Sequence, residues 1–445
     1  MINNNIMRDR IDVDLLGNIT TQSILHYLSE EERKDNKKKK EKADSRSTIQ
    51  LELRTPLLLA QFLSLLPIYG VSNPDYRKLR FEWKSWKVLY SFGIITFNII
   101  LCIFALNRYI RDRGVTYRSL GNPASIRDIM FFGSTLLISM SFLILVRQWK
   151  DFIGKWASLQ GEMNNFESSN VQKKIKLLTN CLLFSSIFEH ILSNTQFMLN
   201  VEENQDRLRM FLDDKNVSSV LGFNTWCYIF IYFGNFLITL IWNYTDIFLT
   251  AVSLSLANMF KQFNRDLRMT AAMVSHDNAL SYWRRKRELY NSLSLLAKTV
   301  EEKISRLVLI SFSVNLYFIC IQLLNSIQPL TSFLQVAYFC GSFGHILFRT
   351  CSVCFAATSI YEHSKGSLPT LYSVSSEQFN SEVQRLIDQV TGETLALTGC
   401  KFFTVTRTLM LTIAGTIVTY EVVLVQFNNP TDDSGSDAHN SSRRA

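Results

Sequence analysis

The sequence lacks the short motifs that mark common catalytic sites. It contains no P-loop, no H-E-x-x-H and no G-x-S-x-G, and its six histidines show no metal-ligand spacing. We therefore expect no enzyme activity, no catalytic residue, no bound metal and no cofactor. Proline is also scarce, with seven in 445 residues, whereas phenylalanine reaches 32 and apolar residues make up 47%. This composition argues against a set of soluble domains and for a membrane protein.

Three further absences narrow the class of protein. Residues 1–50 are polar and hold the run KKKKEK, so no cleavable signal peptide is expected there. The same basic run lacks a folded surface with stacking aromatics, which argues against a nucleic-acid partner. The eight cysteines lie in or beside apolar stretches and form no extracellular disulfide framework. Cys351 and Cys354 form a C-x-x-C motif, but its place within an apolar run favours helix packing over metal binding.

Long apolar runs recur seven times along the chain. Each reaches at least about 18 residues, which is enough to cross roughly 30 Å of hydrocarbon as a helix. The mean hydropathy of +0.07 hides these runs because polar residues are gathered into separate blocks. The predicted fold is an all-α membrane protein with seven transmembrane helices. The predicted spans are 86–106, 129–146, 177–199, 226–258, 304–328, 333–360 and 402–427.

The distribution of Lys and Arg predicts the orientation of the chain. With the N-terminus in the cytosol, about 33 of the 47 basic residues fall in cytosolic segments and about 10 in external ones. This bias predicts a cytosolic N-terminus and an extracellular C-terminus, although the basic loop at 107–119 fits it poorly. By this topology Asn216, in the external loop 200–225, is the sequon best placed for glycosylation.

The segments between the spans predict the domain organisation. Residues 1–50 are too charged to fold and form a disordered cytosolic tail. Residues 51–71 are apolar but interrupted by Pro56, Pro67 and Gly70, which predicts an interfacial or re-entrant helix region over 51–85. Spans four and five continue without breaks into helical patterns, which predicts a cytosolic bundle. The other predicted units are transmembrane helices one to six at 86–360, a cytosolic amphipathic helix at 361–401 that runs into the last span, a pore-lining helix at 402–427 and an extracellular tail at 428–445.

Charged and polar side chains lie inside several spans, where each ionised group costs roughly 2.5 to 3.5 kcal/mol. Tyr232, Asn235, Trp242 and Asp246 follow helical spacings on span four and share one face. Together with polar residues on spans three, five and six, they predict a water-accessible pocket open to the outside. The predicted ligand-binding residues are Glu189, His190, Asn194, Tyr232, Asn235, Trp242, Asp246, Asn315, Tyr317, Gln322, Tyr338 and His345.

Two ligand classes and one structural alternative fit these residues. Carboxylates and amides pair with hydroxyl groups while aromatic planes cover the C–H faces of a sugar ring, so the set suits a neutral polyol. A cation caged by the aromatic rings is the chemical alternative. The structural alternative is internal pairing within the bundle, for example between Asp246 and Arg349. The residues alone leave these alternatives open.

A polar stripe follows the last span, since its members advance by three or four residues and share one helical face. Small hydroxyl residues on such a face suit a helix–helix contact. They also suit a pore lining, in which one such helix from each subunit of a symmetric oligomer surrounds a channel. The stripe consists of Thr412, Thr416, Thr419, Val423 and Gln426, and the bulky Phe427 follows it.

The end of the last span carries a recognisable signature. TYEVVLVQF at 419–427 resembles the T-Y-x5-Q-F signature that closes insect gustatory receptors. The preceding LALTGCKFFTVTRTLMLTIAGTIVTYE resembles the sugar-receptor branch of that family. So do WNYTDIFL at 242–249, LISFSVNLYFICIQLLNSI at 309–327 and LPIYGVSNPDYRKLRFEWKSWKVLYS at 66–91. The resemblance covers about residues 55–427.

This resemblance implies a sweet-taste receptor that is itself a sugar-gated, non-selective cation channel. It implies a homotetramer, or a heteromer with related receptors, assembled around span seven, with a sugar pocket in the outer half of each bundle. It further implies the plasma membrane of gustatory-neuron dendrites, with a mono- or disaccharide, permeating cations and membrane lipid as partners. By the family's motif, Gln426 and Phe427 map onto the narrow external end of a pore that Thr416, Thr419 and Val423 line.

A G-protein-coupled receptor or a solute transporter for a small polar ligand is the alternative. A seven-span receptor of that kind needs the opposite orientation. The chain also lacks D/E-R-Y at the inner end of span three and N-P-x-x-Y in span seven. A transporter is expected to show an internal repeat or paired broken helices, and the sequence shows neither.

Overall fold

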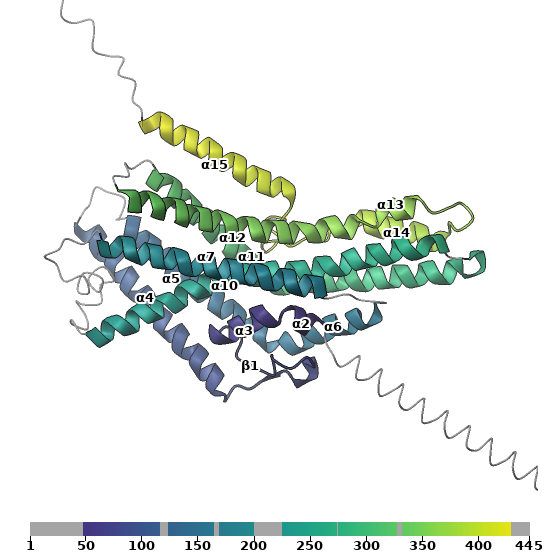
Figure 1. Ribbon diagram of the computed structural model, residues 1–445, viewed down its shortest axis with the longest axis horizontal. Coiled ribbons are helices and arrows are strands. Elements are labelled where there is room, and N and C mark those ends of the chain that lie inside the picture. Colours follow the sequence, from purple (N-terminus) through teal and green to yellow (C-terminus); the bar gives the residue numbers. More distant parts are fainter. Residues whose placement is uncertain are drawn as a thin grey trace, which may run out of the picture.

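In the computed structural model of the 445-residue chain, the described residues are almost entirely helical (Figure 1). It describes residues 48–115, 123–163, 169–199, 225–273, 275–326 and 332–428. Within these ranges, extended pairing is limited to one antiparallel pair of two-residue strands and one isolated bridge. The mostly helical class predicted from the apolar runs is therefore confirmed.

Six of the described helices are long and apolar enough to cross a membrane, and each overlaps one predicted span. Their interiors contain no proline; Pro123 stands at the first position of its helix, where the missing N–H is tolerated. Successive long helices run in alternating directions along the bundle (Figure 1). The six are α4 (Trp86–Val115), α5 (Pro123–Arg147), α7 (Ser169–Leu199), α10 (Thr225–Thr270), α11 (Ala279–Ser326) and α12 (Phe333–Lys365).

Helices α10 and α11 are much longer than a bilayer requires, at 46 and 48 residues. Two short 3-10 helices, η2 (Ala271–Met273) and η3 (His276–Asn278), lie between them. The far ends of the pair pack through aromatic rings, because the Tyr290 ring lies 6.1 Å from the Phe260 ring and 5.7 Å from the Phe263 ring. The helical continuity predicted for spans four and five is therefore observed.

The segment before α4 differs from the helix region predicted over 51–85. It folds into two short helices and a small hairpin. These elements are α2 (Thr48–Glu52), α3 (Arg54–Phe62), β1 (Ile68–Tyr69), η1 (Tyr76–Lys78) and β2 (Arg80–Phe81).

Helices α2 and α3 pack against the bundle, and α2 also packs against α6 (Trp149–Glu162). The Ile49 amide donates to Gln160 Oε1 at 2.8 Å, and the Tyr244 hydroxyl donates to the Pro56 carbonyl at 3.0 Å. In the hairpin, Gly70 has a φ of 86°, and a Cβ at this position would lie 2.4 Å from the Lys78 carbonyl oxygen. The breaks in the apolar pattern therefore mark a compact unit at one side of the bundle.

A second difference lies between α12 and the last helix. The predicted amphipathic helix over 361–401 runs into the last span, whereas the observed α14 (Ser381–Gly392) ends well before it; α13 (Leu368–Tyr372) precedes it. The Lys365 ammonium group donates to three carbonyls at the C-terminus of α14. A cation at this end satisfies carbonyls that have no partner within the helix, so α14 ends there.

The chain from 393 to 406 is a non-helical connector. Thr398 and Thr404 form an isolated antiparallel bridge, and Cys400 and Lys401 between them have positive φ angles of 49° and 65°. This tight turn explains why the predicted helix does not continue into the last span.

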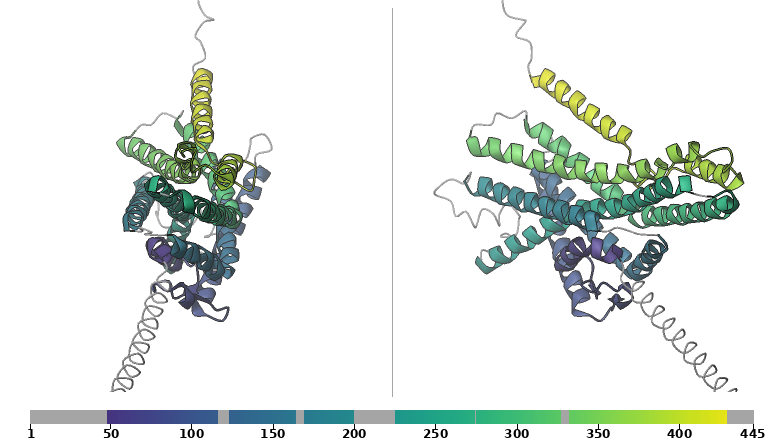
Figure 2. Two further views of the ribbon diagram at one scale, coloured as in Figure 1. Left: turned by 90° about the vertical axis from the view of Figure 1, so that its right-hand side faces the viewer. Right: turned by 45° about the vertical axis from the view of Figure 1, so that its right-hand side comes forward.

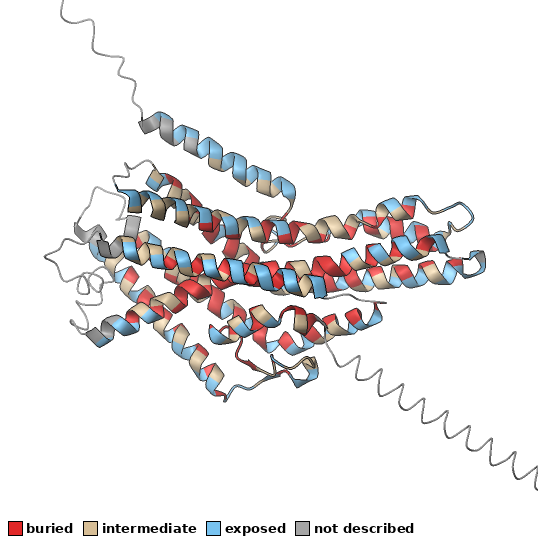
Figure 3. Cartoon of the chain, in the orientation of Figure 1, coloured by how far each residue is buried: buried red, intermediate tan, exposed pale blue. Residues whose placement is uncertain are grey.

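The last helix, α15 (Arg407–Asn428), diverges from the bundle (Figures 1 and 2). Leu409, Met410 and Ile413 in its first half pack against the core, and Ile417 packs against residues of α11 and α12. Most of its other described side chains are exposed, including Leu411 at 73% (Figure 3). The seventh predicted span is thus a helix whose apolar faces are largely uncovered in the single chain.

Candidate ligand-binding site

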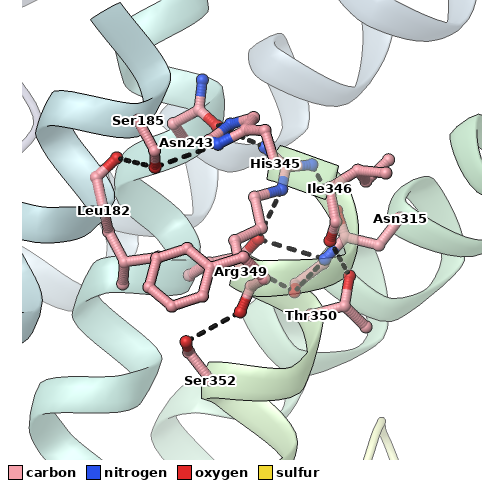
Figure 4. Close-up of polar contacts among 12 residues, drawn as sticks. Leu182, Ser185, Asn243, Asn315, His345, Ile346, Arg349, Thr350 and Ser352 are labelled. Atoms are coloured by element: carbon pink, nitrogen blue, oxygen red, sulfur yellow. Dashed lines mark hydrogen bonds and ion pairs between the residues drawn. The ribbon is translucent and has the colours of Figure 1, made fainter. Parts of the chain in front are cut away.

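Four helices, α7, α10, α11 and α12, bring polar side chains together inside the bundle. Polar groups turn inward there because a lipid-facing position offers them no partner. One group, which we name the central cluster, lies around Arg349 (Figure 4). The central cluster consists of Ser185, Asn243, Asp246, Ser311, Asn315, His345 and Arg349.

Arg349 is the hub of the central cluster, and only 1% of its surface is exposed. Its Nε lies 3.0 Å from Asp246 Oδ2. One terminal nitrogen donates to Asn243 Oδ1 at 2.6 Å, and the other donates to Asn315 Oδ1. The ion pair between Asp246 and Arg349, one of the alternatives that the sequence leaves open, is confirmed.

Asp246 is as well enclosed as its partner. The Ser311 hydroxyl donates to one carboxylate oxygen, and Asn315 Nδ2 donates to the other at 3.1 Å. These bonds join α10, α11 and α12 at one level of the bundle. Removing one partner of such a buried pair costs about 3 to 5 kcal/mol, because the other charge is left without compensation. The central cluster therefore has a structural role whatever else it does.

His345 extends the central cluster to α7. Asn243 Nδ2 donates to the Thr239 carbonyl at 2.9 Å, which leaves Asn243 Oδ1 as an acceptor on its other side. His345 Nε2 lies 2.9 Å from that oxygen, so this nitrogen carries a hydrogen. In the neutral ring, Nδ1 is then the acceptor for the Ser185 hydroxyl, 3.1 Å away. The contacts thus select one tautomer of His345.

Trp242 also belongs to this region of the bundle. The Arg349 guanidinium carbon lies 3.8 Å from the centroid of its ring, a distance typical of a cation–π contact. The rings of Phe318 and Phe131 lie at 4.9 Å and 5.6 Å. Neighbouring side chains thus surround the indole that was predicted to stack on a ligand, and the guanidinium lies over one of its faces.

A second polar group, which we name the end cluster, lies nearer the end of the bundle where α7 ends and α10 begins. Gln322 Nε2 on α11 donates to the Ser342 hydroxyl at 2.9 Å. Ser342 on α12 in turn donates to Glu189 Oε1 on α7 at 3.2 Å. The carboxylate has further acceptor capacity, because two oxygens accept about four hydrogen bonds. We include in the end cluster four further side chains in the same halves of these helices: His190 on α7, Tyr232 on α10, Tyr317 on α11 and Tyr338 on α12.

Two buried polar atoms near the end cluster have no hydrogen-bond partner among the described residues: His190 Nε2 and the Tyr317 hydroxyl. The His190 ring lies 5.2 Å from the Phe236 ring and 6.3 Å from the Tyr232 ring, and 7% of this residue is exposed. Unpaired buried polar atoms are uncommon in native proteins and indicate a place for water or a ligand.

The remaining predicted ligand residues have less defined contacts. Asn194 Nδ2 donates to the His190 carbonyl within its own helix, at 2.7 Å. Asn235 is half-buried on α10, and Tyr338 is half-buried on α12 one turn before Ser342. The structure therefore divides the predicted set into two groups. Trp242, Asp246, Asn315 and His345 lie in or against the central cluster, and the others lie nearer the end of the bundle.

Asn243 and Ser185 were not among the predicted site residues, although they hold His345 and Arg349 in place. Asn243 could have been predicted from the sequence, since it lies three residues before Asp246 and therefore on the same helical face. Ser185 could not have been predicted, because nothing in the sequence distinguishes it from its neighbour Ser186 in the same apolar helix.

The polar stripe of the last helix lies on exposed surface of α15. Each of its three threonine hydroxyls donates to the carbonyl four residues earlier, at 2.9 to 3.0 Å. This bond uses the hydroxyl hydrogen and leaves oxygen lone pairs as acceptors. Val423 and Gln426 are exposed as well. Phe427 stands in the last turn of α15, and its side chain lies outside the described part of the structure.

Two other predictions concern modification and metal binding. The predicted glycosylation residue Asn216 lies outside the described residues. Within the ranges that the structure describes, no group of three or more His, Cys, Asp or Glu side chains is placed to hold a metal ion. In the C-x-x-C motif, Cys351 is exposed and Cys354 is buried.

Known proteins that resemble this chain identify its family. Residues 31–436 match the family described as Trehalose receptor. The chain belongs to the trehalose receptor family. In Drosophila melanogaster, the gustatory receptor for sugar taste 64f is 33% identical over 388 residues, covering 84% of this chain and 80% of the relative. The gustatory receptor 5a for trehalose from the same fly is 32% identical over 380 residues, covering 84% and 83%. The resemblance to the sugar branch of insect gustatory receptors is confirmed.

Solved structures show that the receptor shares its fold with a more distant protein. The insect olfactory receptor OR5 from Machilis hrabei aligns with a TM-score of 0.63 at 16% identity, covering 85% of this chain and 99% of that chain. Its complex with eugenol gives a TM-score of 0.61 at 15% identity, covering 84% and 97%. The arrangement of helices is thus common to both proteins, and the receptor is a multi-pass membrane protein.

Proposed function

We propose that this receptor is a sugar-gated, non-selective cation channel of the plasma membrane in the dendrites of gustatory neurons. Membership of the trehalose receptor family supports a sugar ligand, because relatives are named for sugar taste and for trehalose. The observation that carries the position of the binding site is the pair of unpartnered buried atoms, His190 Nε2 and the Tyr317 hydroxyl. Hydroxyl groups of a sugar both donate and accept, so they are suited to both atoms.

The end cluster is the better candidate for direct sugar contact. The side chains of the central cluster already bond one another, whereas Glu189 retains acceptor capacity beside Gln322. Tyr232 and Tyr338 supply aromatic faces there, and Asn194 and Asn235 supply amides. Asp246, Asn315, His345 and Trp242 then form the base of the pocket and fix the positions of the surrounding helices.

We place the N-terminus in the cytosol and the C-terminus outside, in agreement with the distribution of basic residues. Four subunits surround an axis lined by α15, and the exposure of its apolar faces in the single chain supports such an assembly. The hydroxyl oxygens of Thr416 and Thr419 then face the conduction path. Val423, Gln426 and Phe427 form its narrow external end.

A direct route connects the pocket to the pore helix. Ile417 of α15 packs against a small cluster formed by Ile319, Leu323 and Ile346. Leu323 follows Gln322 in α11, and Ile346 follows His345 in α12. When sugar draws α11 and α12 together, this contact moves α15 and displaces the Phe427 constriction from the axis.

The test is sugar-evoked current in a planar bilayer that contains only this purified protein, with trehalose as the first ligand. The proposal expects discrete cation currents that rise with sugar concentration. A matched variant, His190→Ala, is expected to shift the dose-response curve to higher sugar concentrations while the single-channel conductance stays the same. Dependence of the current on added G protein would refute the proposal. Sugar accumulation in vesicles without channel events would favour a transporter instead.

A further inference from the structure

A separate hollow lies where the hairpin before α4 meets the junction of α5 and α6. Its volume is about 400 Å³. Leu79, Val146 and Trp149 are buried and form an apolar floor. Arg80, Arg147 and Lys150 line it as exposed side chains and form a basic rim. We name this hollow the hairpin pocket.

The cations of the rim are available to a ligand. Among the described residues, no carboxylate forms an ion pair with Arg80, Arg147 or Lys150. Arg147 is held by Trp83, whose ring centroid lies 4.8 Å from the guanidinium carbon. A stacked guanidinium uses its face and keeps its N–H edge free for an anion such as phosphate.

The hairpin pocket also contains two carboxylates, Glu82 and Asp151. With three cations they leave an excess of one positive charge, which suits one phosphodiester. Carboxylates accept hydrogen bonds, so they favour a ligand that carries hydroxyl donors beside its phosphate. A bare polyanion would instead be repelled by them.

The position of the hairpin pocket relates it to the membrane surface. It is lined by residues just before α4 and by the last residues of α5, two helices that are long and apolar enough to cross a bilayer. Trp83 and Trp86 nearby are 50% and 67% exposed, as is typical of interfacial aromatics. Leu89, one turn further along α4, is 74% exposed. The apolar floor thus lies beside a surface on which acyl chains can lie.

We propose that the hairpin pocket binds the headgroup of phosphatidylinositol. Arg147 and Lys150 contact the phosphodiester, Glu82 and Asp151 accept from inositol hydroxyls, and the acyl chains follow α4 into the bilayer. In the proposed orientation this is the cytosolic leaflet. The inference is independent of the sugar ligand, since none of these residues belongs to the central or end cluster.

The test is equilibrium binding of a fluorescent dioctanoyl phosphatidylinositol to the full-length protein in neutral detergent, followed by anisotropy. The unlabelled lipid is expected to compete, whereas dioctanoyl phosphatidylcholine is not. The double variant Arg147→Gln, Lys150→Gln is expected to bind about thirtyfold more weakly, since each cation contributes about fivefold at an anionic headgroup. The matched control is Lys155→Gln, Lys173→Gln, which removes the same charge from exposed positions outside the pocket. Its affinity is expected to remain within about twofold of that of the unchanged protein.

Three outcomes would overturn the proposal. If the Arg147, Lys150 variant bound the lipid with the affinity of the unchanged protein, these two side chains would not contact the headgroup. Full competition by inorganic phosphate or glycerophosphoinositol at the same concentration would make this a site for a soluble anion. Equal competition by phosphatidylcholine would reduce it to an apolar surface. If the double variant does not fold, the single change Lys150→Gln at an exposed position provides the same test, with an expected loss of about fivefold.

Discussion

At the scale of single residues, Arg349 shows how a full charge is accommodated inside an apolar bundle. Its guanidinium contacts Asp246, Asn243 and Asn315 with its nitrogens and Trp242 with its face. The charge was noticeable in the sequence because an ionised group within a span is expensive. Its neutral partners were less noticeable, because amides and serines in a helix are common.

The ion pair of Asp246 and Arg349 leads to the first prediction. Asp246→Asn keeps the shape of the side chain but leaves the buried guanidinium without a counter-ion. We expect the free energy of unfolding to fall by about 3 to 5 kcal/mol. Thermal unfolding of the purified protein in detergent measures this, and Asp277→Asn at an exposed position is the control. An unchanged melting temperature for Asp246→Asn would show that the pair does not stabilise the bundle.

Glu52 leads to the second prediction, which concerns pH. It is buried between α2 and the bundle, and burial raises the pKa of its carboxyl group from 4.5 to about 8, although Ser255 beside it lowers the pKa in part. Between these two values the folded state holds a proton that the unfolded state releases. Stability therefore falls as the pH rises through this window, by up to about 1.4 kcal/mol per pH unit from this group.

The variant Glu52→Gln cannot ionise, so the slope between pH 5 and pH 8 is expected to become flatter and the protein more stable at pH 8. Melting temperatures measured across this range test the change. Exposed Glu162→Gln on α6 serves as the control and is expected to leave the slope as it is. A slope that Glu52→Gln does not alter would contradict the assignment.

At the scale of elements, α14 is held in place by a cap and an ion pair at its N-terminus. Asn380 at its N-terminus accepts hydrogen bonds from the amides of Glu382 and Val383 at 3.0 and 3.2 Å. The Glu382 carboxylate is paired with Arg287 of α11, and the hydrogen bond from Arg287 lowers the pKa of Glu382. This segment docks on α11 through both features.

The third prediction follows from this capping. Asn380→Ala removes the acceptor and is expected to reduce the stability of α14 by about 1 kcal/mol, whereas Asn380→Asp is expected to preserve it. Faster hydrogen exchange of the α14 amides in the alanine variant, with unchanged exchange in α10, is the expected result. Equal exchange in both variants would show that packing alone holds the helix.

The elements themselves were predictable to different degrees. Long apolar runs without proline define helices such as α10 from the sequence alone, since little competes with helix there. The connector at 393–406 was not predictable, because its apolar pattern matches a helix. Its geometry depends on positive φ angles at Cys400 and Lys401 and on the cap that Lys365 provides from a distant helix.

At the scale of the whole molecule, the positions of the six long apolar helices along the chain follow from hydropathy. The pairing of residues between helices does not, because helical periodicity gives the face of a residue and leaves its partner unspecified. The central cluster is an example, since its bonds join positions 160 residues apart in sequence, as between Ser185 and His345. The contacts of the exposed faces of α15 could not be predicted either, because in the proposed assembly other copies of the chain cover these faces.

The fourth prediction concerns the assembled channel. Phe427→Ala removes the bulky side chain at the proposed external constriction, so the current without sugar is expected to rise severalfold over that of the unchanged protein. Leu411→Ala, on an exposed part of the same helix away from the stripe, is the control. Basal current of the Phe427 variant equal to that of the unchanged receptor would count against its role in the gate.

The length of α10 has a mechanical consequence. A continuous helix of 46 residues is a rod of about 70 Å, and it connects the polar clusters to the aromatic packing around Tyr290 without a proline to absorb bending. Tilting such a rod by about 5° about one end displaces the other by about 6 Å, from its length alone. The far end of α10 packs on α11, which the ion pair of Arg287 and Glu382 ties to α14. In the proposed mechanism, a small tilt of α10 at the sugar pocket would therefore be accompanied by a displacement of this distant packing.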